Sequence, residues 1–234
     1  MGVEVLRSCE VTADGEATRP DAERLRPRAG WNPENFAREQ IRGLVRQVFF
    51  ANVDRPPRQV VFSAVEPGVS LRDFCRQVAE ALALQTPATV AVVGKYPRLL
   101  QEADTQGREP AANQVKEGGT SLHQIAARVC RNLWLLPDQD GGGDSPAALH
   151  AYLGEVRRQF DYSIVQGLPV GESDATAAMA QFADGIILVL SAHRTRRAAA
   201  RQIKIALAAA QVCILGAVLA DREFPIPEAI YRRL

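Results

Sequence analysis

The residues whose types and spacing bear most directly on chemistry lie in residues 60–73, where an apolar run, a Pro-Gly turn and a helix start follow one another. This is the layout of a phosphate-binding loop, whose working motif reads G-x-x-x-x-G-K-[ST]. In such a loop the glycines let backbone N–H groups surround the phosphates, the lysine reaches the terminal ones, and the hydroxyl holds magnesium. A strand, a Pro-Gly turn and a helix follow one another in many α/β proteins, however, so the layout alone does not establish nucleotide chemistry.

The side chains that perform this chemistry are missing from the present loop. With the motif anchored on the Pro-Gly turn, its four defining positions hold Val65, Ser70, Leu71 and Arg72. At their own positions the motif requires glycine, glycine, lysine and serine or threonine, and none of the four residues matches. We call the following residues the degenerate phosphate loop: Gly68, Val69, Ser70, Leu71, Arg72 and Asp73.

Composition limits the classes of protein to be considered. The chain has 234 residues, of which 47% are hydrophobic and 24% charged, so it can bury one good-sized core. Its net charge of +1 argues against a general nucleic-acid binder. Four scattered cysteines show no metal-ligand spacing, and no apolar run reaches the roughly 18 unbroken residues of a membrane span. We expect a protein with reduced thiols in the cytoplasm.

Apolar runs alternate with helical patterns along most of the chain. Residues 1–30 lack periodicity and are expected to form a disordered tail, followed by a single domain over residues 31–234. The predicted strands cover residues 59–64, 89–93, 132–136, 162–165, 185–190 and 212–219. The main predicted helices cover residues 34–50, 70–84, 120–130, 145–159 and 194–210. This order predicts an α/β fold with a mostly parallel sheet and helices on both faces.

In open parallel sheets, ligands bind beyond the carboxyl ends of the strands. The turn at residues 65–70 follows the first buried strand of the predicted domain, so it is the expected place for a ligand. This topological argument does not depend on the missing lysine.

Several segments of the chain resemble the bacterial tyrosine-kinase family of capsule and exopolysaccharide synthesis, relatives of the MinD and ParA P-loop ATPases. The most specific is F-A-D-G-I-I-L-V-L at residues 182–190, with R-T-R-R at 194–197 and D-R-E-F-P-I-P-E at 221–228. F-D-Y at residues 160–162 and N-L-W-L-L-P at 132–137 are similar as well. The resemblance covers residues 34–234 and implies a three-layer P-loop NTPase-like fold.

Position by position, the chain departs from what the family uses for chemistry. Leu71 stands where the family has its lysine. Gly94 and Tyr96 stand where it has two aspartates, and Gln166 stands where it has a metal-binding aspartate. The family's kinases commonly end in a tyrosine-rich tail that they phosphorylate, whereas here only Tyr231 lies near the end. The resemblance therefore assigns no catalytic or metal-binding residue to this chain.

Two functions follow from this comparison. The first is a catalytically inactive scaffold or regulatory subunit that needs no cofactor. Its partner would be a membrane polysaccharide co-polymerase or an active kinase homologue, and such a partner would bring it to the inner membrane. A homo-oligomer formed with a second copy of the chain is a further expectation. The alternative is an autokinase or ATPase that binds ATP and Mg²⁺ through a remodelled loop, with Arg72 or Lys95 contacting phosphate.

Charged residues outside the loop suggest two surfaces. Glu39, Arg42 and Arg46 match part of a Glu/Arg motif that the family uses for subunit contacts, although Glu39 and Arg42 also have the spacing of an ordinary helix ion pair. A second, basic cluster begins the helix predicted at residues 194–210, and it reads either as a solvated face or as a surface for an anionic partner. Its members are Arg194, Arg196, Arg197 and Arg201.

Overall fold

The computed structural model describes residues 4–6, 33–51, 54–94, 121–137, 146–171 and 174–221. Within these residues, eight strands form one sheet with the order β1-β8-β7-β2-β6-β3-β5-β4. The strands are β1 (Glu4–Leu6), β2 (Gln59–Ala64), β3 (Val90–Gly94), β4 (Ala127–Cys130), β5 (Leu133–Pro137), β6 (Tyr162–Gln166), β7 (Gly185–Ser191) and β8 (Ile214–Ala220). The helical segments are α1 (Pro33–Val45) with its π-helical extension η2 (Arg46–Phe50), α2 (Leu71–Gln85), α4 (Leu122–Ile125), α5 (Pro146–Gln159), α6 (Asp174–Phe182) and α7 (Arg197–Ala209).

The central strands are parallel, as their continuous apolar sequences predict. Val61 in β2 is in register with Val165 of β6 on one side and Ile186 of β7 on the other. All six residues of β2 are buried, because helices cover both faces of the sheet. Only β1 and β4, at the two edges, run antiparallel to their neighbours.

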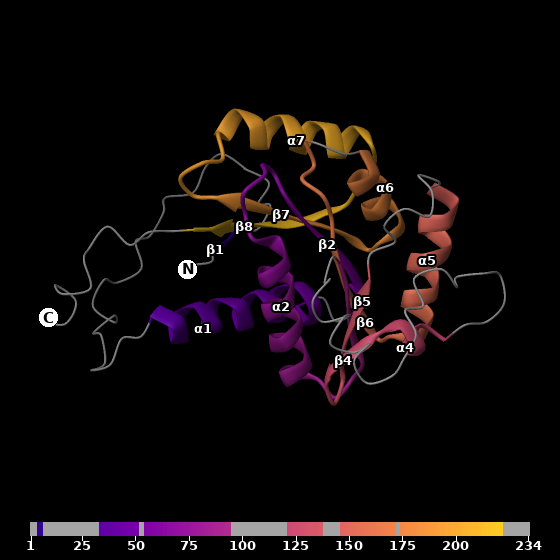
Figure 1. The fold of residues 1–234 in the computed structure, drawn as a ribbon. Coiled ribbons are helices and arrows are strands. Elements are labelled where there is room, and N and C mark those ends of the chain that lie inside the picture. Colours follow the sequence, from indigo (N-terminus) through magenta and orange to yellow (C-terminus); the bar gives the residue numbers. More distant parts are fainter. Residues whose placement is uncertain are drawn as a thin grey trace, which may run out of the picture.

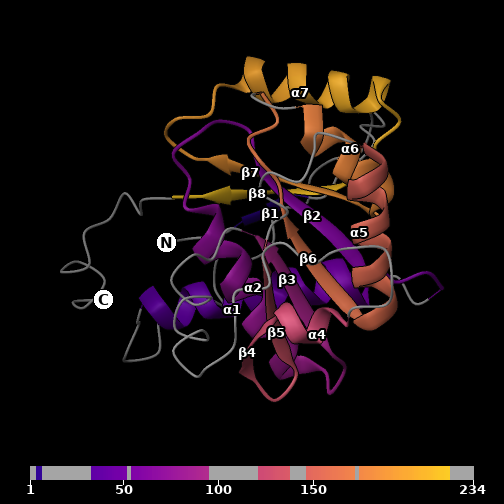
Figure 2. The ribbon, with the colours of Figure 1, turned by 45° about the vertical axis from the view of Figure 1, so that its right-hand side comes forward.

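Helices lie on both sides of the sheet (Figure 1), and two apolar layers fill the space between the sheet and these helices. On one face, α1, η2 and α2 pack through residues such as Phe49 and Leu82 onto Phe62 and its neighbours. On the other face, α4, α5, α6 and α7 pack through residues such as Val156 and Leu207. Figure 2 shows α5, α6 and α7 together on this second side. The predicted three-layer α/β architecture is confirmed.

The predicted helix over residues 120–130 is wrong in its second half. Only α4 is helical, and residues 127–130 form the edge strand β4 against β5. The Arg128 guanidinium lies over the Trp134 ring, 5.3 Å from its centroid, and also donates to the carbonyls of Cys130 and Arg131. These contacts form only in the strand and its turn, and they stabilise that conformation more than the local sequence pattern favours a helix.

The prediction of a disordered tail over residues 1–30 is wrong for β1, which pairs with β8 through the register Val5 to Val218. Composition did not indicate this strand, since its pairing partner lies at the far end of the sequence. The other residues of this segment lie outside the described part of the chain.

Asp184 fastens the start of β7 to the start of β2. One of its carboxylate oxygens accepts hydrogen bonds from the backbone N–H groups of Arg58 (2.7 Å) and Gln59 (2.8 Å), and the other accepts one from Arg157 (2.8 Å). Burial alone would raise the pKa of Asp184, but these three donors hold the pKa below its ordinary value. The network sets the strand register at the edge opposite the candidate site.

Candidate functional site

The candidate site is the turn between β2 and α2, residues 65–70. Because β2 lies between β6 and β7 in the middle of the sheet, this turn lies at the centre of the carboxyl edge. Gly68 has φ = +105°, a backbone conformation that side chains with a Cβ rarely adopt, so the Pro-Gly turn requires glycine here.

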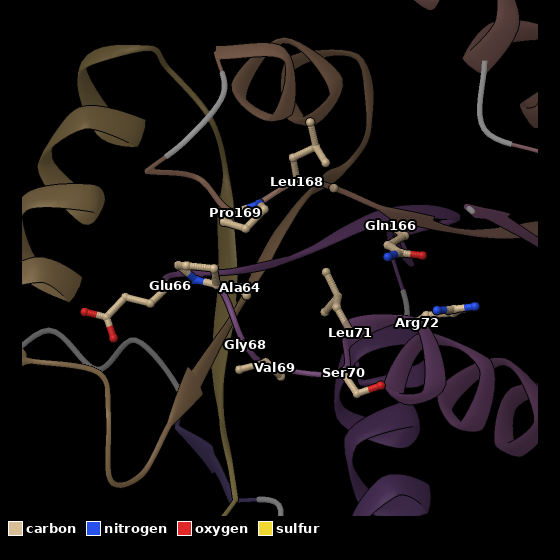
Figure 3. A pocket seen from close by; sticks show the side chains of 12 residues that line it. Ala64, Glu66, Gly68, Val69, Ser70, Leu71, Arg72, Gln166, Leu168 and Pro169 are labelled. Carbon is tan, nitrogen blue, oxygen red and sulfur yellow. The ribbon is translucent and has the colours of Figure 1, made fainter. Parts of the chain in front are cut away.

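A pocket of about 290 Å³ lies between this turn and the loop that follows β6 (Figure 3). It contains five of the six residues of the degenerate phosphate loop, all but Asp73, together with Gln166 at the end of β6. Its lining residues are Ala64, Glu66, Pro67, Gly68, Val69, Ser70, Leu71, Arg72, Gln166, Gly167, Leu168 and Pro169. The turn at which topology predicts a ligand therefore lines a pocket, and ligand binding there stays a prediction.

Backbone hydrogen bonds hold the two sides of the pocket together. The N–H of Gly167 donates to the carbonyl of Phe62 (2.8 Å), and the N–H of Val170 donates to the carbonyl of Ala64 (3.1 Å). The Ser63 hydroxyl also donates to the Leu168 carbonyl. None of these bonds involves a side chain from the degenerate phosphate loop, so the two sides of the pocket are joined without them.

Leu71 belongs to the hydrophobic core as well as to the pocket wall. Its side chain is only 6% exposed and packs with the apolar residues of α2 and of the sheet face beneath it. The motif requires a lysine at this position to neutralise phosphate charge. An aliphatic side chain cannot do so.

The polar groups at the start of α2 are engaged with one another. The Ser70 hydroxyl donates to the Asp73 carboxylate at 2.6 Å. Asp73 therefore places a negative charge in the first helical turn, where the positive end of the helix dipole would otherwise favour an anionic ligand.

The charged side chains of the pocket extend away from its centre. In Figure 3, Arg72 and Glu66 project in opposite directions from the turn, and Leu71 and Leu168 lie between them. Gln166 contributes a neutral amide, whose buried Oε1 has no hydrogen-bond partner among the described residues. Gly94 is the last residue of β3, and β6 separates β3 from β2 in the sheet. Gly94 does not line the pocket. Tyr96 lies outside the described residues.

We tested whether the described residues fit a magnesium-bound nucleotide. Such a ligand needs cationic donors around the phosphates and oxygen ligands for the metal. Two cations are present, Arg72 in the pocket lining and Arg194 against Gly68. The position that the motif gives to lysine holds the aliphatic Leu71, however, the Ser70 hydroxyl is already bonded to Asp73, and Glu66 adds a carboxylate. In the described part of the chain, no group of three His, Cys, Asp or Glu could hold a metal ion. The described residues therefore do not fit a magnesium-bound nucleotide, because they lack the lysine and the assembled metal ligands.

Arg194 reaches the turn from a distant part of the sequence. An ideal Cβ built on Gly68 would lie 2.8 Å from Arg194 Nη1, so this guanidinium lies directly against the loop. Sequence reasoning identified Arg194 only as part of a basic cluster. The contact arises because β7 is adjacent to β2 in the sheet, so the segment that follows β7 lies beside the turn that follows β2.

The proposed contact residues lie on α1 and η2, on the face of the sheet that α2 also covers. Arg42 Nη1 is 3.0 Å from Glu39 Oε1, and both side chains are exposed. Arg46 donates to Gln85 at the end of α2 that lies away from the pocket (3.3 Å). The structure therefore places these three residues apart from the pocket, and contact with a partner stays a prediction.

Two of the described histidines and one of the described cysteines are occupied in packing. The His123 ring packs against Trp134 and Phe160, and the His150 ring packs against Phe182. Burial raises the pKa of the Cys75 thiol, which disfavours the reactive thiolate.

The sheet order, the two helical layers and the central strand-turn-helix unit define a class: this is an α/β domain with the MinD/ParA-like P-loop NTPase fold. Among solved structures it is similar to the BceF tyrosine kinase domain, with a TM-score of 0.58 and 17% identity over 79% of this chain and 77% of that one.

Two further structures support the same fold. The kinase domain of the Escherichia coli tyrosine kinase ETK matches with a TM-score of 0.55 and 15% identity, over 81% of this chain and 79% of that one. The MinD cell division protein of Aquifex aeolicus matches with a TM-score of 0.54 and 15% identity, over 69% and 68%. No family model and no curated protein sequence matches the chain.

Among the described helices, none combines the length and the apolar character that crossing a bilayer requires.

Proposed function

We propose that the chain is a catalytically inactive, tyrosine-kinase-like protein that acts as a scaffold or regulatory subunit in bacterial exopolysaccharide or capsule synthesis or export. The observation that carries the proposal is the buried position of Leu71, which puts an aliphatic group where phosphoryl transfer requires a cation. The fold shared with tyrosine kinase domains supports the choice of family.

The other substitutions support the same conclusion. Phosphoryl transfer relies on positioning and on charge neutralisation by lysine and magnesium. Gln166 supplies an amide in place of a metal-binding carboxylate, and Gly94 supplies no side chain. The Ser70 hydroxyl is bonded to Asp73. The protein would therefore act by binding a partner through its surface. The proposed partner is a polysaccharide co-polymerase, an active kinase homologue or a second copy of the chain.

Thermal denaturation with and without ATP and Mg²⁺ tests the proposal. A ligand present at 100 times its dissociation constant stabilises a protein by about 2.7 kcal/mol, which is easily measured. We expect millimolar ATP with Mg²⁺ to leave the melting temperature unchanged relative to Mg²⁺ alone. A clear increase would contradict the scaffold function and favour the alternative, an ATP-binding autokinase or ATPase with a remodelled loop.

A further inference from the structure

Positive charge is concentrated on α7 and on the residues just before it. Residues 185–220 contain no Asp or Glu, and all their Arg and Lys residues fall between positions 194 and 204. All of these cationic side chains are exposed. They are Arg194, Arg196, Arg197, Arg201 and Lys204, which we call the α7 basic surface. Because the whole chain has a net charge of only +1, the remaining residues are net acidic.

An exposed apolar residue lies at the border of this surface. The Leu207 side chain is buried against the sheet, with Ile203 packed beside it, and these residues define the inward side of α7. Ile205 lies on the opposite side and is 63% exposed. At 100° per residue, Ile205 falls next to Arg201 on the outward side, with Ala198 beside it. The three cations of α7 (Arg197, Arg201 and Lys204) all lie on one side of Ile205, so the helix exposes an aliphatic side chain at the border of its cationic flank.

The position of α7 leaves this surface accessible. In both Figure 1 and Figure 2, α7 runs along the outside of the molecule, and no described element lies beyond it. Arg194 lies against the turn at Gly68, and Glu66 is the acidic residue of that turn. This single carboxylate does not neutralise the five cations of the α7 basic surface.

We propose that the α7 basic surface binds directly to a bilayer containing anionic phospholipids. Clusters of Lys and Arg on or beside a helix are characteristic of such binding, and each cation near the membrane contributes about a fivefold increase in affinity. Here three of the five cations lie on α7 and two lie just before it. A protruding helix presents its whole outer face to a planar surface. Ile205 and the alanines beside it would enter the boundary between headgroups and acyl chains while the guanidinium groups bind lipid phosphates.

The outward isoleucine distinguishes a bilayer from nucleic acid. Nucleic-acid surfaces contact phosphates with cations and stack bases on aromatic rings, whereas the outer face of α7 has aliphatic residues and no aromatic one. Membrane binding through α7 does not depend on the scaffold function, because an active or an inactive pocket would leave this face of α7 unchanged.

Co-sedimentation with lipid vesicles tests this surface. The purified chain is mixed with vesicles of phosphatidylcholine containing about 30 mol % phosphatidylglycerol, or with phosphatidylcholine alone, at low and high salt. We expect binding only to the anionic vesicles, and weaker binding at high salt. The triple variant Arg197→Gln, Arg201→Gln and Lys204→Gln should lower the partition coefficient about 100-fold. Ile205→Ser should lower it by about tenfold.

A matched control removes positive charge elsewhere. Arg131 and Arg158 are exposed and lie away from α7, so Arg131→Gln with Arg158→Gln should leave the partition coefficient within about twofold. Melting temperatures confirm that each variant is folded. The proposal is wrong if the wild type does not bind anionic vesicles, if phosphatidylcholine alone binds equally well, or if the control loses as much binding as the triple variant. Binding to a short DNA duplex without binding to vesicles would assign the surface to nucleic acid instead.

Discussion

Replacing Leu71 by lysine restores the one side chain that the phosphate-binding motif most obviously lacks, and we expect it to restore no activity. The other polar groups around the pocket would remain the amide of Gln166, the guanidinium of Arg72 and the carboxylates of Glu66 and Asp73. Since a lysine supplies only one of several charges that the transition state needs, neither nucleotide affinity nor phosphoryl transfer should appear.

The structure also sets the stability cost of this change. Leu71 is 6% exposed in the core, and full burial of a leucine contributes about 1.5–3 kcal/mol. A lysine keeps its methylene groups in the core, but its ammonium must reach the pocket or lose its charge. We therefore expect Leu71→Lys to lower the free energy of unfolding by about 1–3 kcal/mol, which corresponds to about 2–12 °C in melting temperature. Leu71→Met is the matched control, with an expected loss below about 1.5 kcal/mol.

The assay combines thermal denaturation with a radiolabel transfer experiment, each with and without ATP and Mg²⁺. Leu71→Lys should melt lower than Leu71→Met, and nucleotide should shift neither. Autophosphorylation by Leu71→Lys, or a rise in its melting temperature with ATP, would refute the reasoning, since it would mean that the remaining residues suffice. A melting temperature equal to that of the wild type would show that Leu71 contributes nothing to the core.

Two further predictions concern regions away from the pocket. Asp184→Ala leaves two backbone N–H groups and Arg157 without their acceptor, so urea unfolding at neutral pH should show a loss of about 1–3 kcal/mol. Because the folded-state pKa of Asp184 is lowered, its contribution is present above the unfolded pKa of about 4 and disappears as the pH falls through the folded value, so the difference between variant and wild type should shrink in acid; a constant difference would contradict this. If α1 forms a subunit contact, Glu39 and Arg42 pair across the boundary, where breaking a desolvated charge pair costs about 2–5 kcal/mol. Arg42→Glu should then shift sedimentation toward the monomer, or release a partner's cytoplasmic segment. The melting temperature of the isolated subunit should hardly change, since an exposed helix pair is worth only about 0.3–0.5 kcal/mol, and identical sedimentation in every mixture would rule out the contact.

Local pattern was sufficient for most of the fold. The apolar run at β2 and the helical spacing of α2 predicted a strand, a turn and a helix whose inward residues include Leu71, Phe74 and Leu82, and all three are buried. These features are encoded within a few residues of one another, so periodicity detects them.

Pairings between distant segments could not be predicted in this way. Residues 127–130 continued a helical pattern, but the contact of Arg128 with Trp134 on the neighbouring strand stabilises an edge strand instead. The approach of Arg194 to Gly68 depends on the adjacency of β7 and β2, which no local pattern encodes. The unpaired Oε1 of Gln166 is likewise a property of the packed pocket and not of the sequence around it.

The pocket keeps its shape through main-chain bonds between β2 and the loop after β6, so the fold does not require side chains able to bind phosphate. Catalytic groups held in strained or desolvated positions commonly cost stability, and a buried leucine in place of a lysine removes that cost. A chain of this kind can therefore keep the fold and use its surfaces. The two proposed surfaces lie on opposite faces of the sheet, since α1 packs on one face and α7 on the other. Because they share no residues, Arg42→Glu should leave vesicle binding intact, and the triple variant of α7 should leave the sedimentation of the free protein unchanged.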